Sequence, residues 1–231
     1  MNKLHNFATG YVLEICAIII FPFSIVLGVL KFILPLELVN PSSTEKFPIV
    51  ISEQWFNKNY WHFLMKNYLV KKGYKVYWVD YSILKGGIDD GAKNLQKFFI
   101  ENDIKNAVLV GISYGAVSAF YYLQYLDGWD RVSKFISVAG PLKGTPKAYL
   151  LFFLKAGWQI FPNSQFIKKL VELPINNPEK ILCISAKHDE LVPLSSSRLP
   201  NVKNVISNTI GHNMLHMFSK EVFKLIAEES K

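Results

Sequence analysis

The sequence Gly-Ile-Ser-Tyr-Gly at residues 111–115 constrains the fold of this 231-residue chain more than any other stretch. An apolar run at residues 107–110 precedes it, and a helix-like segment at residues 116–126 follows at once. Gly-x-Ser-x-Gly between a strand and a helix is typical of a nucleophile elbow, a strained turn that exposes the serine hydroxyl at the start of the helix. Flanking glycines relieve the crowding of such a turn. The pattern predicts a nucleophile at Ser113; a glycine-rich turn in an ordinary α/β protein is the alternative.

Strand-like and helix-like segments alternate along the rest of the chain. Predicted strands cover residues 47–52, 75–79, 107–110, 132–138, 180–185 and 202–206. Predicted helices cover residues 55–71, 92–102, 116–126 and 214–229. Such alternation predicts the α/β class, with a mostly parallel central sheet and helices on both faces.

Composition limits the classes of partner. The formal net charge is +8, but the lysines are scattered rather than clustered, which argues against nucleic acid and favours a mild attraction to anionic membranes. The two cysteines, Cys16 and Cys183, lie in apolar segments, and their spacing suggests neither a disulfide nor a metal site. We expect no cofactor or metal, and a monomer.

The N-terminal segment differs from the rest of the chain. Residues 15–30 carry no charge, and the apolar stretch over residues 11–36 is long enough to cross a bilayer as a helix. We therefore predict a membrane anchor at 1–39, a linker at 40–46 and a catalytic domain at 47–231. The distribution of lysines places that domain on the non-cytoplasmic side. A cleaved signal peptide, which would release a secreted protein, and an interfacial segment bent at Pro22 are the alternatives.

Residues 140–178 interrupt the alternation. Within them, residues 148–161 are apolar nearly all round, with Lys155 as the one charge, and residues 166–171 are amphipathic. Insertions at the carboxyl edge of a parallel sheet commonly roof the site. A hydrophobic lid or acyl-chain wall that dips into a membrane is one interpretation, and a buried helix that covers the sheet is the other.

A serine nucleophile needs a base and an acid that orients the base. His212, in Ile-Gly-His-Asn after the last predicted strand, is the first candidate for the base, and His216 is the second. Asp189, in the loop after the strand at 180–185, is the first candidate for the acid, and Glu190 is its near competitor. The order Ser, Asp, His along the chain is the order that an α/β hydrolase requires.

An oxyanion hole needs two N–H donors. We expect the backbone N–H of Tyr114 to be one, because it follows the nucleophile. The other should come from Gln54 or Trp55, with Trp55 preferred, in the loop after the first strand. Glu53 next to them would oppose a developing anion unless it points away or is paired.

Four blocks of the sequence resemble the small bacterial triacylglycerol lipases (lipase class 2) of the α/β-hydrolase superfamily. They are the elbow at 108–115 with its extension through 121–123 and 126–128, the stretch 132–145, the acid block 184–193, and 199–205 leading to Gly211 and His212. The resemblance covers about residues 47–228 and implies an α/β-hydrolase fold with Ser113, Asp189 and His212 as nucleophile, acid and base. The chain departs from the family at Ile112, at Ala116 and in lacking a His-Gly pair after the first strand.

These observations together predict a membrane-associated serine hydrolase of the lipase or carboxylesterase type that acts on lipid or long-chain acyl esters. Acyl transfer, thioester hydrolysis or amide hydrolysis on the same three residues is one alternative. A catalytically weak, membrane-tethered binding protein on a hydrolase scaffold is the other.

Overall fold

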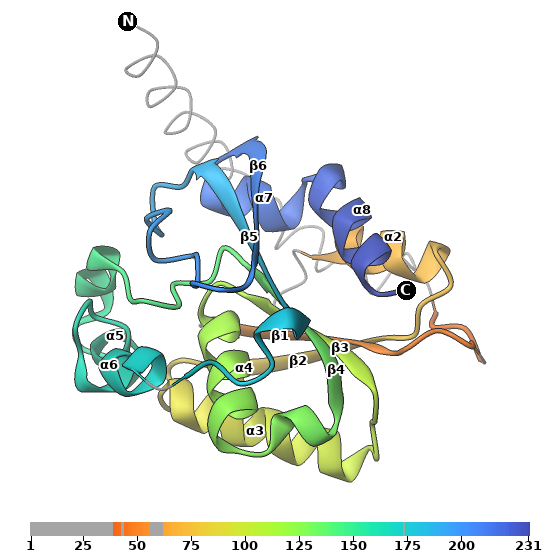
Figure 1. Ribbon diagram of the computed structural model, residues 1–231, viewed down its shortest axis with the longest axis horizontal. Coiled ribbons are helices and arrows are strands. Elements are labelled where there is room, and N and C mark those ends of the chain that lie inside the picture. Colours follow the sequence, from red (N-terminus) through yellow and green to blue (C-terminus); the bar gives the residue numbers. More distant parts are fainter. Residues whose placement is uncertain (1–38, 43, 56–61, 173) are drawn as a thin grey trace, which may run out of the picture.

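The computed structural model describes residues 39–42, 44–55, 62–172 and 174–231. Within these ranges the strands form one parallel sheet in the order β2-β1-β3-β4-β5-β6 (Figure 1). The strands are β1 Ile49–Trp55, β2 Val76–Ser82, β3 Ala107–Ile112, β4 Val132–Val138, β5 Ile181–His188 and β6 Lys203–Ile210. The order reverses between β1 and β3, and a crevice at such a switch point is where open parallel sheets bind ligands.

Helices cover both faces of this sheet, as the alternation predicts (Figure 1). The α-helices are α2 Phe63–Lys71, α3 Ile88–Glu101, α4 Tyr114–Tyr125, α5 Lys155–Gln159, α6 Gln165–Glu172, α7 His212–Met217 and α8 Lys220–Glu229. The short 3-10 helices in the part of the chain that the structure describes are η1 Gly128–Asp130, η2 Pro146–Leu151 and η3 Pro178–Lys180.

The central strands β1 and β3 are buried on both faces, which is why each face can support a core. Val50 and Leu109 pack on one face in a cluster with Phe99 of α3 and Phe120 of α4. Neighbouring strand residues pack on the other face with α2 and α8, in a cluster that includes Ile49, Ile51, Met65, Leu69 and Phe223. Successive side chains of a strand point to opposite faces, so β1 contributes alternately to the two cores.

One predicted helix is broken in the structure, and the apolar segment at 148–161 is divided into two short helices. The helix expected at 214–229 is two helices, because the Ser219 side chain caps α8 by accepting a hydrogen bond from the N–H of Val222 at 3.4 Å. The apolar segment 148–161, for which a buried helix is one of the two interpretations, divides into η2 and α5 around the extended Leu154. Gly157 permits this fold, since a Cβ there would lie 2.0 Å from the carbonyl oxygen of Leu151.

The polar side of α5 attaches the interrupting segment to the start of α3. The ammonium of Lys155 lies 2.9 Å from Asp89 Oδ1 and 2.8 Å from Asp90 Oδ2. Gln159 Nε2 donates to Asp89 Oδ1 at 2.7 Å. The hydrogen bonds from Lys155 and Gln159 hold the pKa of the Asp89 carboxyl below its ordinary value despite its partial burial. The orientation of α5 is therefore set by polar contacts, with Ala156 buried in the core and Trp158 exposed.

The predicted anchor lies outside the described residues apart from Val39. None of the helices in the described ranges has the length and apolar character needed to span a bilayer. The predicted linker contacts the sheet domain, since the Asn40 side chain accepts from the N–H of Val76 at 2.9 Å and donates to its carbonyl at 2.8 Å.

Candidate active site

Ser113 occupies a strained turn between β3 and α4. Its backbone has φ 50° and ψ −122°, which a residue with a side chain adopts only when its surroundings enforce it. The two glycines explain how the turn fits. A Cβ on Gly111 would lie 2.4 Å from the Cα of Ala116, and one on Gly115 would lie 2.2 Å from the carbonyl oxygen of Ser52. The local structure is thus the elbow that the sequence predicts.

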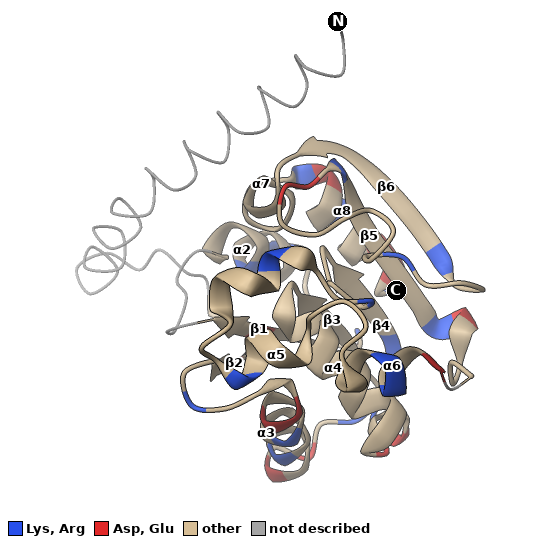
Figure 2. Ribbon diagram, turned by 90° about the vertical axis from the view of Figure 1, so that its left-hand side faces the viewer, with Lys and Arg blue, Asp and Glu red and all other residues tan. Residues whose placement is uncertain are grey.

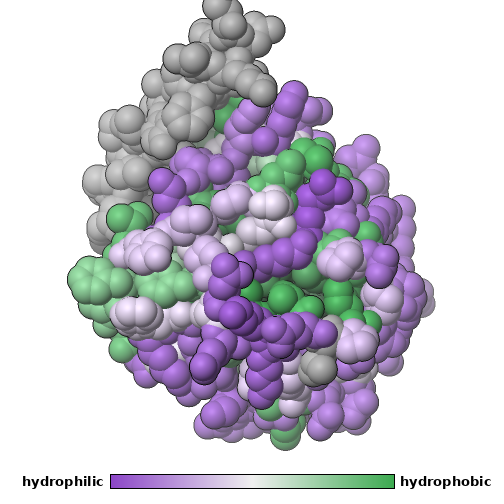
Figure 3. Space-filling view, turned by 60° about the vertical axis from the view of Figure 1, so that its left-hand side comes forward, coloured by the Kyte–Doolittle hydropathy of each residue, from purple (hydrophilic) through white to green (hydrophobic). Residues whose placement is uncertain are grey.

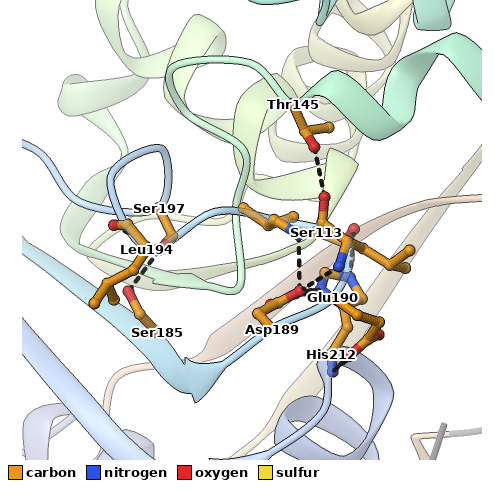
Figure 4. Close-up of polar contacts among 10 residues, drawn as sticks. Ser113, Thr145, Ser185, Asp189, Glu190, Leu194, Ser197 and His212 are labelled. Carbon is orange, nitrogen blue, oxygen red and sulfur yellow. Dashed lines mark hydrogen bonds and ion pairs between the residues drawn. The ribbon is translucent and has the colours of Figure 1, made fainter. Parts of the chain in front are cut away.

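His212 follows the last strand of the sheet and reaches back to Ser113. Its Nε2 lies 3.0 Å from the Oγ of Ser113 (Figure 4). Gly211, at φ 97°, makes the sharp change of direction from β6 into α7, so that His212 is the first residue of that helix. The side chain of His212 is 4 % exposed, which restricts solvent around the hydrogen bond.

Asp189 is the first residue after β5 and holds the other nitrogen of the same imidazole. Its Oδ2 lies 2.9 Å from His212 Nδ1. Asp189 Oδ1 also accepts hydrogen bonds from the backbone N–H groups of Leu191 and Val192, at 2.9 and 2.8 Å. Because the carboxylate is held by its own loop, it fixes the imidazole with its Nδ1–H toward Asp189 and its Nε2 toward Ser113.

The structure thus brings together the three residues predicted as nucleophile, acid and base, at the carboxyl ends of three different strands (Figure 4). The competing candidates lie nearby in other roles. The carboxylate of Glu190 is within 3.3 Å of the backbone N–H of His212. His216 lies beside His212, with the ring centroids 5.3 Å apart and the planes at 81°.

Tyr114 begins α4, so its backbone N–H is one of the helix's first donors and has no partner within the helix. Its position directly after Ser113 is the position that the sequence analysis assigns to the first oxyanion donor. The Tyr114 ring is 7 % exposed, and burial raises the pKa of its phenol, so the ring stays neutral beside the site.

Trp55 as the preferred second donor is wrong. Trp55 does not begin a helix but ends β1, where it pairs with Ser82 of β2. Its carbonyl accepts a hydrogen bond from the N–H of Ile83 at 2.9 Å. The N–H and C=O of one residue in a parallel strand face the same neighbour, so the N–H of Trp55 faces β2 and not Ser113.

Backbone N–H groups alternate between the two neighbouring strands along β1, so the N–H of the preceding residue, Gln54, faces β3, the strand that leads to Ser113. The register therefore supports the backbone N–H of Gln54 as the second donor. The side chain of Gln54 is directed away from the site. Its Nε2 donates to the Gly87 carbonyl at 3.3 Å, and its Oε1 accepts from the hydroxyl of Ser118. Because both polar atoms of the Gln54 side chain are used in these buried contacts, only the backbone N–H of Gln54 is proposed as an oxyanion donor.

Within the described ranges, no group of three His, Cys, Asp or Glu side chains is arranged to hold a metal ion. Cys183 is fully buried in β5, and burial raises the pKa of its thiol to about 12, so it is a packing residue. Cys16 lies outside the described residues.

No protein-family model matches this chain. Several solved structures are similar to it at low sequence identity. The mature form of lipase BlEst2 from Bacillus licheniformis has a TM-score of 0.65 at 17% identity, over 83% of this chain and 96% of that one. The monoacylglycerol lipase of Paleococcus ferrophilus has a TM-score of 0.60 at 14% identity, over 80% and 97%.

A third similar structure is MGS-MChE2, described as an α/β hydrolase, from the metagenome of lagoon sediments at Mar Chica, Morocco. It has a TM-score of 0.56 at 20% identity and covers 80% of this chain and 91% of its own. Identities this low show a shared fold and not a shared activity. The chain has the α/β-hydrolase fold, which confirms the fold that the sequence predicts.

Proposed function

Given an α/β-hydrolase fold, we propose that this protein is a serine ester hydrolase of the lipase or carboxylesterase type. The observation that carries the proposal is the continuous hydrogen-bonded chain from Ser113 Oγ through His212 to Asp189, with distances of 3.0 and 2.9 Å. A serine held this way loses its proton to the imidazole as it attacks. A serine hydroxyl without such a base is a weak nucleophile at neutral pH.

The reaction has two halves. In the first, Ser113 Oγ bonds to the acyl carbon while His212 Nε2 takes the hydroxyl proton, and the carbonyl oxygen becomes an oxyanion held by the N–H groups of Tyr114 and Gln54. The imidazolium then donates that proton to the leaving alcohol as the ester bond breaks. In the second half, water loses a proton to His212 as it attacks the acyl carbon, and the imidazolium then returns that proton to Ser113 Oγ as the ester bond to the serine breaks and the acid leaves. Asp189 stabilises the imidazolium each time it forms.

Labelling with a fluorophosphonate tests this proposal, because the probe reacts only with an activated serine. We expect the wild type to be labelled and Ser113→Ala to be unlabelled while keeping its circular dichroism spectrum and melting temperature. Absence of labelling in folded wild-type protein rejects the enzyme and favours the non-catalytic binding protein.

An exposed apolar surface supports a lipid or long-chain ester as the substrate. Five large side chains of η2, α5 and the turn between them are each at least 59% exposed: Tyr149, Leu150, Phe152, Phe153 and Trp158. Figure 3 brings this side of the molecule forward and shows hydrophobic surface among hydrophilic residues. Apolar side chains gathered in this way commonly mark a surface that meets lipid or another apolar partner. We call these five residues the apolar rim.

Charge around the apolar rim favours an anionic lipid surface. Residues 140–171, the segment that contains the rim, have five Lys and no Asp or Glu, and one of the five, Lys155, pairs with Asp89 and Asp90 of α3. η2 contains Lys147 and α5 contains Lys155, and neither contains an acidic residue. Figure 2 shows the basic residues in blue along the ribbon. Basic residues beside exposed aromatic ones are the combination that binds headgroups and the acyl boundary together. The segment that contains the rim begins next to the loop that carries Asp189. Thr145, just before η2, donates a hydrogen bond to the carbonyl of Leu191 in that loop.

Hydrolysis of p-nitrophenyl esters with increasing acyl length tests the substrate class. We expect kcat/KM to rise from acetyl to octanoyl, because a longer chain buries more apolar surface. A sharp preference for acetyl rejects a lipase. Carbonate extraction of membranes tests the proposed N-terminal anchor separately, since a spanning helix stays in the pellet and release into the supernatant rejects it.

A further inference from the structure

The loop that carries Asp189 is fastened to the segment before η2 through the hydroxyl of Thr145. We call residues 189–197 the acid loop. Thr145 Oγ1 donates to the carbonyl of Leu191 in this loop (Figure 4), and it accepts from the N–H of Lys147 at 3.3 Å. Thr145 is 2% exposed, so water competes little for these contacts. The reaction described above does not use this side chain.

The carbonyl that Thr145 holds belongs to a peptide unit that holds Asp189. The C=O of Leu191 and the N–H of Val192 are the two ends of one planar peptide group and point in opposite directions. That N–H donates to Asp189 Oδ1 at 2.8 Å, and the N–H of Leu191 donates to the same oxygen at 2.9 Å. A rotation of this peptide would therefore break a contact to the acid at one end and the contact to Thr145 at the other.

A continuous series of hydrogen bonds runs from Thr145 to the nucleophile. Beyond the two N–H groups on Oδ1, Asp189 Oδ2 lies 2.9 Å from His212 Nδ1, and His212 Nε2 lies 3.0 Å from Ser113 Oγ. Donation to the Leu191 carbonyl also polarises its peptide, which makes the N–H of that peptide a stronger donor. The hydroxyl of Thr145 thus acts on the orientation of the Asp189 carboxylate without touching it.

Thr145 is itself held in place from two sides. Its N–H donates to the carbonyl of Ile160, at the end of α5, at 2.9 Å. Gly144 has φ 82°, and a Cβ there would lie 2.9 Å from the same carbonyl oxygen, so a residue with a side chain would be strained at this position. On the other side, the Ser196 hydroxyl of the acid loop donates to the Gly144 carbonyl. This short stretch therefore forms a fixed support for the acid loop.

We propose that Thr145 is a positioning residue for the catalytic acid, whose hydroxyl keeps the Asp189 carboxylate in the orientation that serves His212. This inference rests on the proposed hydrolase function, since it assigns a role in the same reaction. The imidazolium forms only as Ser113 attacks, so a displaced carboxylate weakens the transition state more than it weakens substrate binding. Loss of the hydroxyl therefore lowers kcat and leaves KM nearly unchanged.

The test compares wild type with Thr145→Val, which removes the hydroxyl and keeps the branched side chain. We expect kcat for p-nitrophenyl butyrate to fall by about tenfold, with KM within about threefold of wild type. Thr145→Ser returns the hydroxyl, and we expect its kcat to lie within about threefold of wild type. A Thr145→Val protein with wild-type kcat, or a Thr145→Ser protein as slow as Thr145→Val, overturns the proposal.

Thr44→Val is the matched control. Thr44 donates to a distant carbonyl, that of Gly73, at 2.8 Å and accepts at 3.1 Å from the N–H of Lys46, two residues on, just as Thr145 does with its own partners. The contacts of Thr44 lie in the loop before β2, so we expect Thr44→Val to keep wild-type kcat. An equal loss of kcat in the control overturns the proposal.

A second comparison shows whether Thr145 acts through Asp189. Once the carboxylate is gone, its orientation no longer matters, so we expect Thr145→Val to cost less than about twofold in kcat in the Asp189→Asn background. A loss of about tenfold in both backgrounds overturns the proposal, because the hydroxyl would then act by another route.

Melting temperatures show which variants are folded. If Thr145→Val does not fold, Thr145→Cys takes its place, because its thiol is a weak donor. A fall of about threefold or more in kcat with unchanged KM then supports the proposal, and wild-type kcat overturns it. Wild-type protein that neither hydrolyses the ester nor takes the fluorophosphonate rejects the hydrolase function, and this inference with it. An active wild type with a fully active Thr145→Val rejects the positioning role alone.

Discussion

The carboxylate of Glu190 accepts from the backbone N–H of His212 at 3.2 Å and does not hold its imidazole. The imidazole of His212 is held by the residue before Glu190, Asp189, whose Oδ2 lies 2.9 Å from His212 Nδ1. Two adjacent acids thus divide the donors of one histidine between them. Glu190 fixes where the first turn of α7 begins, and Asp189 fixes how the imidazole is turned.

Substitution of each acid by its amide separates the two roles. Asp189→Asn leaves an amide that can donate to Nδ1 and so favours the wrong tautomer, and we expect kcat to fall by about 10³- to 10⁴-fold. Glu190→Gln keeps an acceptor for the N–H of His212, and we expect a fall of about tenfold or less. Steady-state hydrolysis of p-nitrophenyl butyrate measures both. Equal losses would reverse the assignment of the acid.

Gly115→Ala tests the close approach of α4 to β1. The added methyl would lie 2.2 Å from the Ser52 carbonyl oxygen and 2.7 Å from the Cα of Glu53, which are backbone atoms that cannot rotate away. We expect the free energy of unfolding to fall by about 1–3 kcal/mol, with fluorophosphonate labelling strongly slowed. Ser113→Ala is the control, because it removes the nucleophile and leaves the packing intact. A Gly115→Ala protein as stable and as reactive as wild type contradicts this account of the turn.

Replacement of Phe152 and Phe153 by serine tests the apolar rim. Both side chains are already more than half exposed, so we expect the melting temperature to stay within about 2 °C of wild type. Binding to vesicles with anionic lipid should weaken by about tenfold or more. Ile100→Ser on α3 is the matched control, since Ile100 is 56% exposed on another part of the surface. An equal loss of binding in the control variant would show that the rim is not the docking surface.

His216 makes folding stability depend on pH. Its folded-state pKa is lowered, so below about pH 6.5 the unfolded chain binds a proton that the folded protein does not. The contribution of the neutral His216 imidazole to the free energy of unfolding is therefore fully present above about pH 6.5. It decreases as the pH falls, by up to about 1.4 kcal/mol per pH unit. Urea unfolding at pH 7.5, 6.5 and 5.5 measures the slope for wild type and His216→Asn. We expect the variant's slope to be smaller, and identical slopes contradict a neutral buried imidazole.

The fold and the positions of Ser113, Asp189 and His212 were accessible from the sequence because each depends on local signals. An apolar run followed by Gly-x-Ser-x-Gly specifies strand, turn and helix within a few residues. The acid and the base each follow a strand, and the carboxyl ends of parallel strands share one edge of the sheet. Order along the chain was therefore enough to predict which loops meet.

Features that depend on register or on distant partners were not accessible in this way. Trp55 was preferred over Gln54 because the residues alone do not show which of the two N–H groups faces β3. The break at Ser219 depends on a cap that competes with a continuous apolar pattern. The contact between His62 and His216 joins positions 154 residues apart, and no local pattern announces it.

That last contact has a consequence for how this chain can change over generations. His62 and His216 each satisfy a buried polar atom of the other, so replacement of one leaves its partner without a hydrogen bond in a dry interior. A substitution at either position is then harmful until the second follows. Among descendants of this sequence we expect the two imidazoles to be kept or discarded together.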